Sequence, residues 1–220
     1  MNPYQVLAAA AADWDRLAGL LKPASGSQLE ARLQALRSAG QDGPARLQAA
    51  EKAARLLLEA LPDAESGRLD DASGARFAGD PQDRSHLGFH ADDLAVLVLD
   101  GHRMVGPVLG PTRARILAVP ALDPDEVRLL GGDPGAAGLL RLTGLGGRLR
   151  LPGFQFGVAG APLPTVVEVN TLLDAERDPW GVADWWLSAN AWLGGNPADL
   201  LGAGRDGQLV DAARYLSEEE

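Results

Sequence analysis

The three histidines of the chain, His86, His90 and His102, lie within seventeen residues of one another and beside several aspartates. The first two are four residues apart, which places both side chains on one face of a helix and could serve a metal ion. The sequence has no HExxH motif, and His86 lies in a segment with the composition of a linker. We therefore interpret the cluster as a coincidence of spacing and expect no metal site.

The other patterns that could support catalysis are incomplete. The glycines around Gly144–Gly147 lack the Lys-Ser or Lys-Thr of a phosphate-binding loop and predict a turn instead. The sequence has no Gly-x-Ser-x-Gly, no order of Ser, His and Asp that suggests a triad, and no pattern that pairs two carboxylates. It also has no cysteine, which excludes thiol catalysis and disulfides. We expect a protein that is not an enzyme and that has no cofactor.

Aromatic residues are concentrated near the C-terminus, where four of the five tryptophans lie. Trp180 and Trp186 share one face of a helix that Asp178–Pro179 would start. Trp185 points elsewhere, because successive helical residues differ by about 100°. Clustered tryptophans dominate protein interfaces, and they also fill the cores of small domains. Trp186 suits either location, whereas we interpret Trp185 and Trp192 as surface anchors.

The net charge of −10 is unevenly distributed. Residues 151–220 carry three basic and eleven acidic side chains, whereas residues 94–150 carry seven arginines and five acidic side chains. The C-terminal third should therefore repel nucleic acid and suit a basic protein partner. No stretch approaches the roughly 18 apolar residues of a membrane span, and the N-terminus lacks the basic start of a signal peptide. We expect a cytoplasmic protein with no membrane contact.

The elements that position these residues are mostly helices. Apolar spacing predicts three of them in residues 1–61: one that ends before Pro23, one over residues 28–38, and one that begins at Pro44. Residues 62–88 are rich in Asp, Gly, Ser and Pro, which predicts an acidic linker. Three short helices must pack together or on a partner, so this segment suits either homo-oligomerisation or a separate module.

Residues 89–151 form the predicted middle domain, α-helical with a small β-hairpin. Residues 92–99 fit either a short helix or a buried strand. Asp123, Pro124 and Glu126 make a capping-box pattern that starts a helix. Residues 139–151 alternate apolar residues with arginine around a glycine turn, which predicts the hairpin. With small helices expected over residues 152–220, the predicted fold class is mostly α.

The segment from about Phe154 to Leu216, under a third of the chain, resembles the toxin-binding domain of bacterial Xre/MbcA/ParS-like antitoxins. The shared features are a helix ending in Trp-Leu, an Asn shortly before Leu-Gly-Gly, a Pro-x-x-Leu-Leu, and a final helix led by Gly or Asp. The preceding LPGFQF resembles the strand that introduces this domain. The resemblance predicts a partner-binding surface that comprises Trp185, Trp186, Asn190, Trp192, Leu193, Gly194, Gly195, Pro197, Leu200 and Leu201.

What the resemblance implies is an antitoxin-like protein that neutralises a RES-type toxin, an enzyme that consumes or transfers the ADP-ribose part of NAD. The C-terminal part would occupy the entrance of the toxin's active site. Many such antitoxins also bind DNA through a helix-turn-helix. Here residues 133–138 (DPGAAG) replace the recognition helix and offer no base-reading side chain.

Two other functions remain open from the sequence. One is a protein-interaction adaptor that uses a toxin-binding-like fold for another contact. The other is a DNA-binding autoregulator that uses the arginines of residues 103–150.

Overall fold

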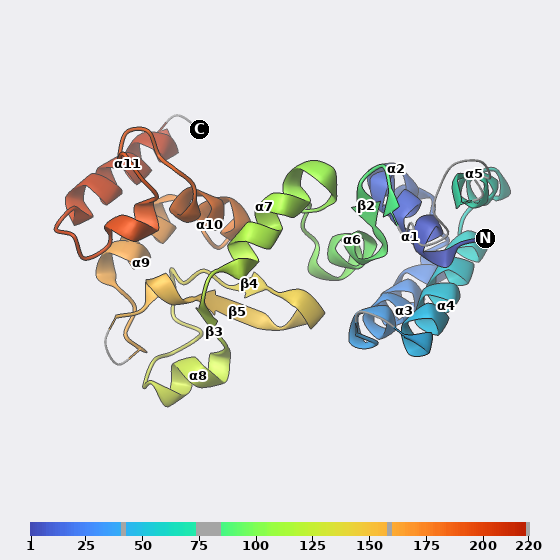
Figure 1. Ribbon diagram of the computed structural model, residues 1–220, viewed down its shortest axis with the longest axis horizontal. Helices are drawn as coiled ribbons and strands as arrows, with labels where there is room; N and C mark the ends of the chain where they lie inside the picture. Colours follow the sequence, from blue (N-terminus) through green and yellow to red (C-terminus); the bar gives the residue numbers. More distant parts are fainter. Residues whose placement is uncertain (41–42, 74–84, 158–159, 219–220) are drawn as a thin grey trace. The chain divides into compact units, whose positions relative to one another are not determined.

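The computed structural model describes residues 1–40, 43–73, 85–157 and 160–218 (Figure 1). The fold is mostly α with small antiparallel sheets, which confirms the predicted class. The chain forms two compact units, residues 1–111 and 112–220. This division differs from the predicted middle domain, because residues 89–99 pack into the same apolar cluster as the N-terminal helices.

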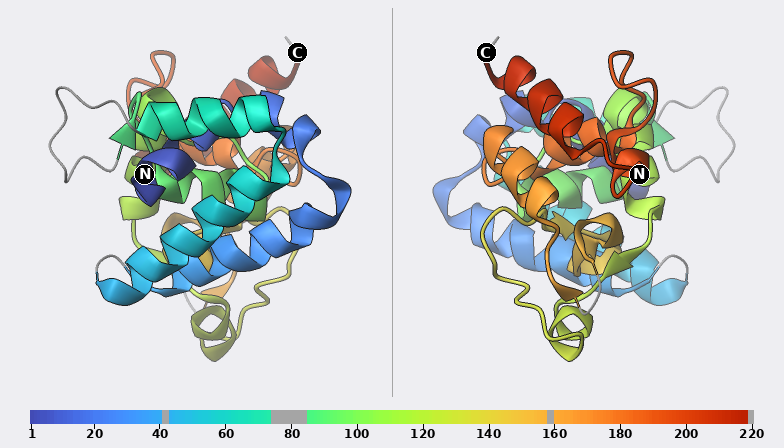
Figure 2. Two further views of the ribbon diagram at one scale, coloured as in Figure 1. Left: turned by 90° about the vertical axis from the view of Figure 1, so that its right-hand side faces the viewer. Right: turned by 90° about the vertical axis from the view of Figure 1, so that its left-hand side faces the viewer.

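Helix α1 (Pro3–Ala12) forms the centre of the first unit. Its residues Val6, Leu7 and Ala10 are fully buried, as expected for a helix that is apolar on all sides. Helices α4 (Pro44–Ala60), α5 (Asp63–Ser73) and α6 (Ala91–Ala95) pack against α1, and α3 (Gly26–Ser38) packs beside α4 (Figure 2). The three predicted N-terminal helices are therefore present. The first of them breaks at Asp13, after which α2 (Trp14–Leu17) and a short 3-10 turn, η1 (Ala18–Leu20), follow.

The prediction of a linker over residues 62–88 is wrong for the described part of that range. Helix α5 occupies Asp63–Ser73, and its Leu69 belongs to the core of the unit. Strands β1 (Ser85–His86) and β2 (Phe89–His90) form a tight hairpin. Packing against a formed core stabilises this helix, although its amino-acid composition alone would not make it stable. Residues 74–84 of the predicted linker lie outside the described residues.

Two bidentate ion pairs attach residues 91–100 to the N-terminal helices. Helix α6 continues as a π-helical turn, η3 (Val96–Asp100), so the open choice between helix and strand is decided in favour of the helix. Arg37 of α3 donates to both carboxylate oxygens of Asp100 at 2.9 and 2.8 Å, and this pair is buried. Arg46 of α4 donates to both oxygens of Asp92 at 2.9 and 2.8 Å.

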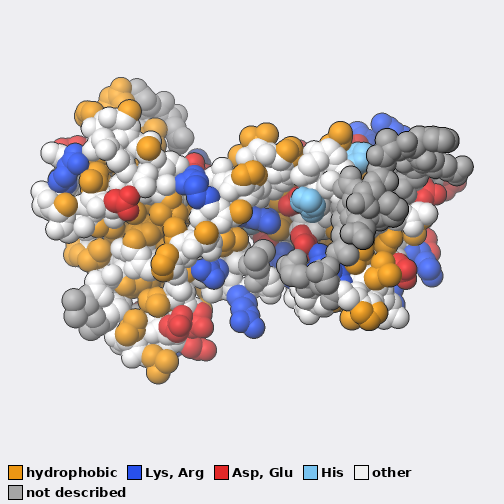
Figure 3. Space-filling view, viewed as in Figure 1, with side chains coloured by type: hydrophobic (Ala, Val, Ile, Leu, Met, Phe, Trp, Pro, Cys, Tyr) orange, Lys and Arg blue, Asp and Glu red, His pale blue; other side chains and the backbone are white. Residues whose placement is uncertain are grey.

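A three-stranded antiparallel sheet organises the first half of the second unit. Its order is β3 (Ala121–Leu122), β5 (Leu149–Pro152) and β4 (Leu142–Thr143), so the predicted hairpin is confirmed as β4–β5. Helix α7 (Gly106–Ala118) precedes the sheet. Helix α8 (Pro124–Leu129) has the predicted capping box, in which the Asp123 carboxylate accepts from the Glu126 backbone at 2.8 Å. Acidic and hydrophobic side chains are visible over α8 (Figure 3), and Leu129 at its end is 87% exposed.

Three helices complete the second unit. They are α9 (Pro164–Leu172), α10 (Pro179–Leu187) and α11 (Asp206–Glu218), with a 3-10 turn, η7, at Pro197–Leu200. Helices α9 and α11 pack side by side (Figure 2). Helices α10 and α11 agree with the sequence prediction, whereas α9 was not expected. Among the described residues, no helix has both the length and the apolar character needed to cross a membrane.

Candidate partner-binding site

A buried hydrogen-bond network fixes the position of α10. The side chain of Trp186 has no exposed surface, and its Nε1 donates to the Oδ1 of Asn170 at 2.8 Å. The Nδ2 of Asn170 donates in turn to the Gly138 carbonyl at 2.7 Å. Each of these buried polar atoms therefore has a hydrogen-bond partner, as burial requires. The prediction that Trp186 belongs to the partner-binding surface is wrong, because a partner cannot reach this side chain.

The side chain of Trp185 packs against the buried ring of Trp186. Its ring is T-shaped on Trp186, with the ring centroids 5.1 Å apart and the planes at 83°. Phe154 contacts the Trp186 ring as well, at a centroid distance of 5.4 Å. Trp185 is half-buried, so it is held by the core and still presents surface to solvent.

The loop between α10 and η7 is closed on itself and presents Trp192. The Asn190 carboxamide oxygen accepts from the backbone amides of Trp192 and Leu193 at 2.9 and 3.1 Å. Asn190 also pairs with Gly195 across the loop, and Gly194 takes a φ of 75°, which favours glycine. These bonds order the loop, so its exposed side chain has a defined direction.

Trp192 and Tyr215 form an exposed aromatic pair. Trp192 is 66% exposed and Tyr215 of α11 is 56% exposed. Their rings are in T-shaped contact with centroids 5.6 Å apart, an arrangement that aromatic rings prefer. They form one end of an open cavity of about 570 Å³, which is lined by Trp185, Asn190, Trp192, Ala212, Tyr215 and Leu216.

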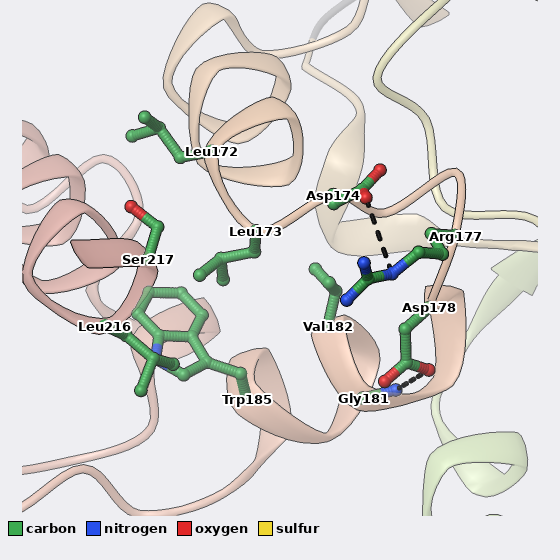
Figure 4. Close-up of a pocket in the computed structure, with 10 residues that line it drawn as sticks. All are labelled: Leu172, Leu173, Asp174, Arg177, Asp178, Gly181, Val182, Trp185, Leu216 and Ser217. Atoms are coloured by element: carbon green, nitrogen blue, oxygen red, sulfur yellow. Dashed lines mark hydrogen bonds and ion pairs between the residues drawn. The ribbon is translucent and has the colours of Figure 1, made fainter. Parts of the chain in front are cut away.

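A second cavity of about 400 Å³ continues from the first (Figure 4). Trp185 and Leu216 line both cavities, so the two form one groove between α10 and α11. In Figure 4 the Trp185 ring lies between Leu216 and Leu173, and Val182 lies further along α10. We refer to the combined surface as the α10–α11 groove.

Carboxylates lie along part of the edge of the α10–α11 groove. Asp178 lies at its edge and caps α10, accepting from the Gly181 backbone at 2.9 Å. Asp174 pairs with Arg177 at 3.6 Å, and Asp211 pairs with Arg214 at 3.7 Å. Arg177 offsets one of the two carboxylates that line the smaller cavity, Asp174 and Asp178, so this lining keeps an excess of negative charge. The surroundings of the groove are therefore apolar at the centre and acidic at the edge.

The structure brings together some of the predicted residues and separates others. Trp185, Asn190 and Trp192 line the groove. Gly194 and Gly195 shape the loop, whereas Leu193 and Pro197 are buried beneath it. Leu200 and Leu201 are half-buried and do not line either cavity. Their predicted role in partner binding stays a prediction.

Several lining residues were missed from the sequence, and four of the apolar ones come from the end of α9 and from the outer side of α11. Tyr215 and Leu216 follow Ala212 by three and four residues, so they continue a helical stripe of which only the first part is buried. A search for apolar positions one turn beyond the buried face would have found them. These four residues are Leu172, Leu173, Tyr215 and Leu216.

Comparisons of the chain with family models, curated proteins and solved structures find no match. Within the described parts of the chain, no three His, Asp or Glu side chains come together in a way that could hold a metal ion.

Proposed function

We propose that the protein is an antitoxin-like protein that binds and neutralises a RES-type, NAD-consuming toxin through the α10–α11 groove. The observation that carries this proposal is the exposed Trp192–Tyr215 pair, held over an apolar cavity by an ordered loop. Exposed aromatic residues beside a pocket are typical of the centres of protein interfaces. The same segment carries the antitoxin-like motifs of the sequence.

Charge supports a partner of this kind. Arginine and lysine side chains are frequent ligands of phosphate groups such as the pyrophosphate of NAD. Residues 151–220 carry eleven acidic and three basic side chains, so this segment would be attracted to an active-site entrance that carries such side chains.

Co-expression tests the proposal. We expect the adjacent reading frame to encode a RES-type protein that lowers cellular NAD and stops growth when it is expressed alone. Co-expression with this chain should restore growth, and the two proteins should co-elute in gel filtration. Trp192→Ala should abolish rescue, whereas Leu129→Ala, which truncates an even more exposed side chain on α8, should not. A harmless neighbour, or a pair that elutes separately, would sink the proposed function.

An adaptor function is the second candidate, and one observation favours it. The first unit has its own open cavity of about 570 Å³, with Trp14, Phe89 and the strongly exposed Val108 among its lining residues. Such a cavity could bind a second protein. An adaptor would bind two partners at once, whereas an antitoxin of the proposed kind needs only the second unit.

The arginines of the middle segment give little support to DNA binding. Arg115 donates to the Leu187 carbonyl at 2.7 Å and pairs with Asp184. Arg141 donates to the Pro134 carbonyl at 2.9 Å, and Arg150 donates to the Val119 carbonyl. Side chains occupied by acceptors of their own chain are poorly placed to contact phosphates. A gel shift with the upstream DNA should therefore show no salt-sensitive binding.

A further inference from the structure

We infer that the α10–α11 groove takes an amphipathic helix of the partner, with apolar side chains in the groove and lysine or arginine along the acidic edge. This inference rests on the proposed function for the identity of the partner. It adds the form and the chemistry of the segment that the partner inserts.

The walls of the groove have the geometry that receives a helix. Along α10 the lining residues Asp178, Val182 and Trp185 are four and three residues apart, and along α11 Ala212 and Leu216 are four apart. The groove therefore follows one face of each helix. A channel between two helices accepts the side-chain ridge of a third, which is a common mode of helix recognition.

The two cavities differ in what they would bind. The larger one is aromatic, with Trp185, Trp192 and Tyr215 around it. Aromatic rings bind the aliphatic stem and the cationic head of lysine or arginine as well as apolar groups. The smaller one has Leu173 and Val182 on its walls, which suits leucine or isoleucine. Two such cavities that share Trp185 match side chains one or two turns apart on a helix.

The charged side chains around the groove favour a basic helix over an acidic one. Asp178 and Asp174 lie at the smaller cavity, Asp211 lies on α11 close to Tyr215, and Glu218 ends that helix. Arg177 and Arg214 are basic, and both form ion pairs with these or neighbouring carboxylates. An acidic helix would be repelled, whereas a basic one would gain attraction that weakens with added salt.

A peptide that binds as an added strand is one alternative occupant. Such a peptide is held by the open edge of a sheet. The residues that line the two cavities belong to the end of α9, to α10 and α11, and to the chain segments that follow α9 and α10, and none belongs to a named strand. The backbone groups that a strand-like peptide requires are therefore lacking at the described lining.

A synthetic peptide tests the inference with the full chain. The probe has about 18 residues, long enough to form a helix, with leucines at helical spacing on one face and lysines elsewhere. The first control peptide has the same composition with the leucines scrambled, and the second has glutamate in place of lysine. Fluorescence anisotropy should show saturable binding of the probe that is at least about tenfold tighter than that of either control.

Site variants distinguish the groove from general attraction to an acidic protein. Trp192→Ala and Leu216→Ala should each weaken probe binding about tenfold, and Leu129→Ala should leave it unchanged. Trp192 and Leu216 are exposed, so circular dichroism should show that both variants fold normally. Equal binding of the scrambled peptide, or binding unchanged in both groove variants, would overturn the inference.

Competition separates this inference from the proposed function. The probe should displace the RES-type product of the adjacent reading frame from the protein. If that product binds through Trp192 but the probe does not compete, the helix-in-groove inference is wrong and the proposed function stands. If the probe binds in the groove while no RES-type product associates, the proposed function is wrong and the inference stands.

Discussion

The cores of the two units of this chain are filled by different kinds of side chain. The first unit buries leucine and alanine around α1 and attaches α6 and η3 with the Arg37–Asp100 and Arg46–Asp92 pairs. The second unit buries Trp186 and orients it with the amide of Asn170. The side chains of an aliphatic core are positioned by packing alone. A buried indole whose Nε1 donates a hydrogen bond has one fixed orientation. The fixed indole of Trp186 in turn supports Trp185 at the surface.

We interpret this difference between the cores as a division between side chains that stabilise the fold and side chains that are available to a partner. The Arg37–Asp100 pair of the first unit lies inside the fold, so it holds elements together and is not available to a partner. In the second unit the buried ring of Trp186 contacts Trp185. Trp185 in turn lines the same cavity as the exposed pair Trp192 and Tyr215. We therefore expect substitutions in the first unit to affect folding, and expect the second unit to contain positions that affect binding alone.

The largest effect is expected for Trp186→Ala. Removing a fully buried tryptophan leaves a cavity and should lower the free energy of unfolding by about 3–5 kcal/mol. Trp192→Ala in the same unit should change it by less than about 0.5 kcal/mol, because that side chain is mostly exposed. Urea denaturation followed by circular dichroism measures both. Equal losses in the two variants would contradict the separation of core from surface.

A comparable effect is expected in the first unit for Arg37→Ala. This variant leaves the buried carboxylate of Asp100 unpaired and should cost about 3 kcal/mol. The double variant Arg37→Met, Asp100→Leu should recover most of this loss, because no charge is then buried without a partner. Urea denaturation of the two variants measures the difference. A double variant as unstable as Arg37→Ala would show that the pair itself, and not the abandoned charge, determines stability.

A smaller loss is expected for Asn170→Leu. The substitution removes the acceptor of the Trp186 Nε1 and the donor to the Gly138 carbonyl. Buried polar atoms without partners cost about 1–3 kcal/mol. Hydrogen exchange should rise in α10 and in the segment around Gly138. Exchange that stays at the wild-type level there would mean that packing alone positions Trp186.

The smallest effect concerns Glu65 of α5. Its pKa is lowered, first because its carboxylate accepts hydrogen bonds from Arg16. A carboxylate with a lowered pKa stabilises the folded state above its ordinary pKa of 4.5, and this contribution is lost as the pH falls through the lowered value. Glu65→Gln should therefore lower the unfolding midpoint at neutral pH, and the difference should vanish in acid. Glu30→Gln, on the exposed side of α3, is the control, and a difference that persists at low pH would contradict this account.

The elements that the sequence predicted correctly are those that depend on short local patterns. The capping box at Asp123, the glycine turn of the β4–β5 hairpin and the Asp178–Pro179 start of α10 each depend on residues within one turn. The structure places Trp192 at the surface, as its interpretation as a surface anchor requires.

The missed features depend on packing between distant segments. Helix α9 contains Val166, Val167 and Val169, which favour strands, and it is helical where it packs on α11. Helix α5 has little apolar periodicity and depends on Leu69 and on the ion pair of Glu65 with Arg16. Tyr215 joins the site only because the 190–195 loop places Trp192 beside it. The apolar stripe of α11 marks Tyr215 as a candidate, but no local pattern encodes its contact with Trp192.

The central claim is that the second unit, through the α10–α11 groove, is the binding surface of the protein. Hydrogen exchange of the full chain, with and without the RES-type product of the adjacent reading frame, tests it most directly. We predict protection of the loop around Trp192 and of α10 and α11, with residues 1–73 unchanged. Protection confined to residues 1–111, with α10 and α11 exchanging as in the protein alone, would contradict the claim.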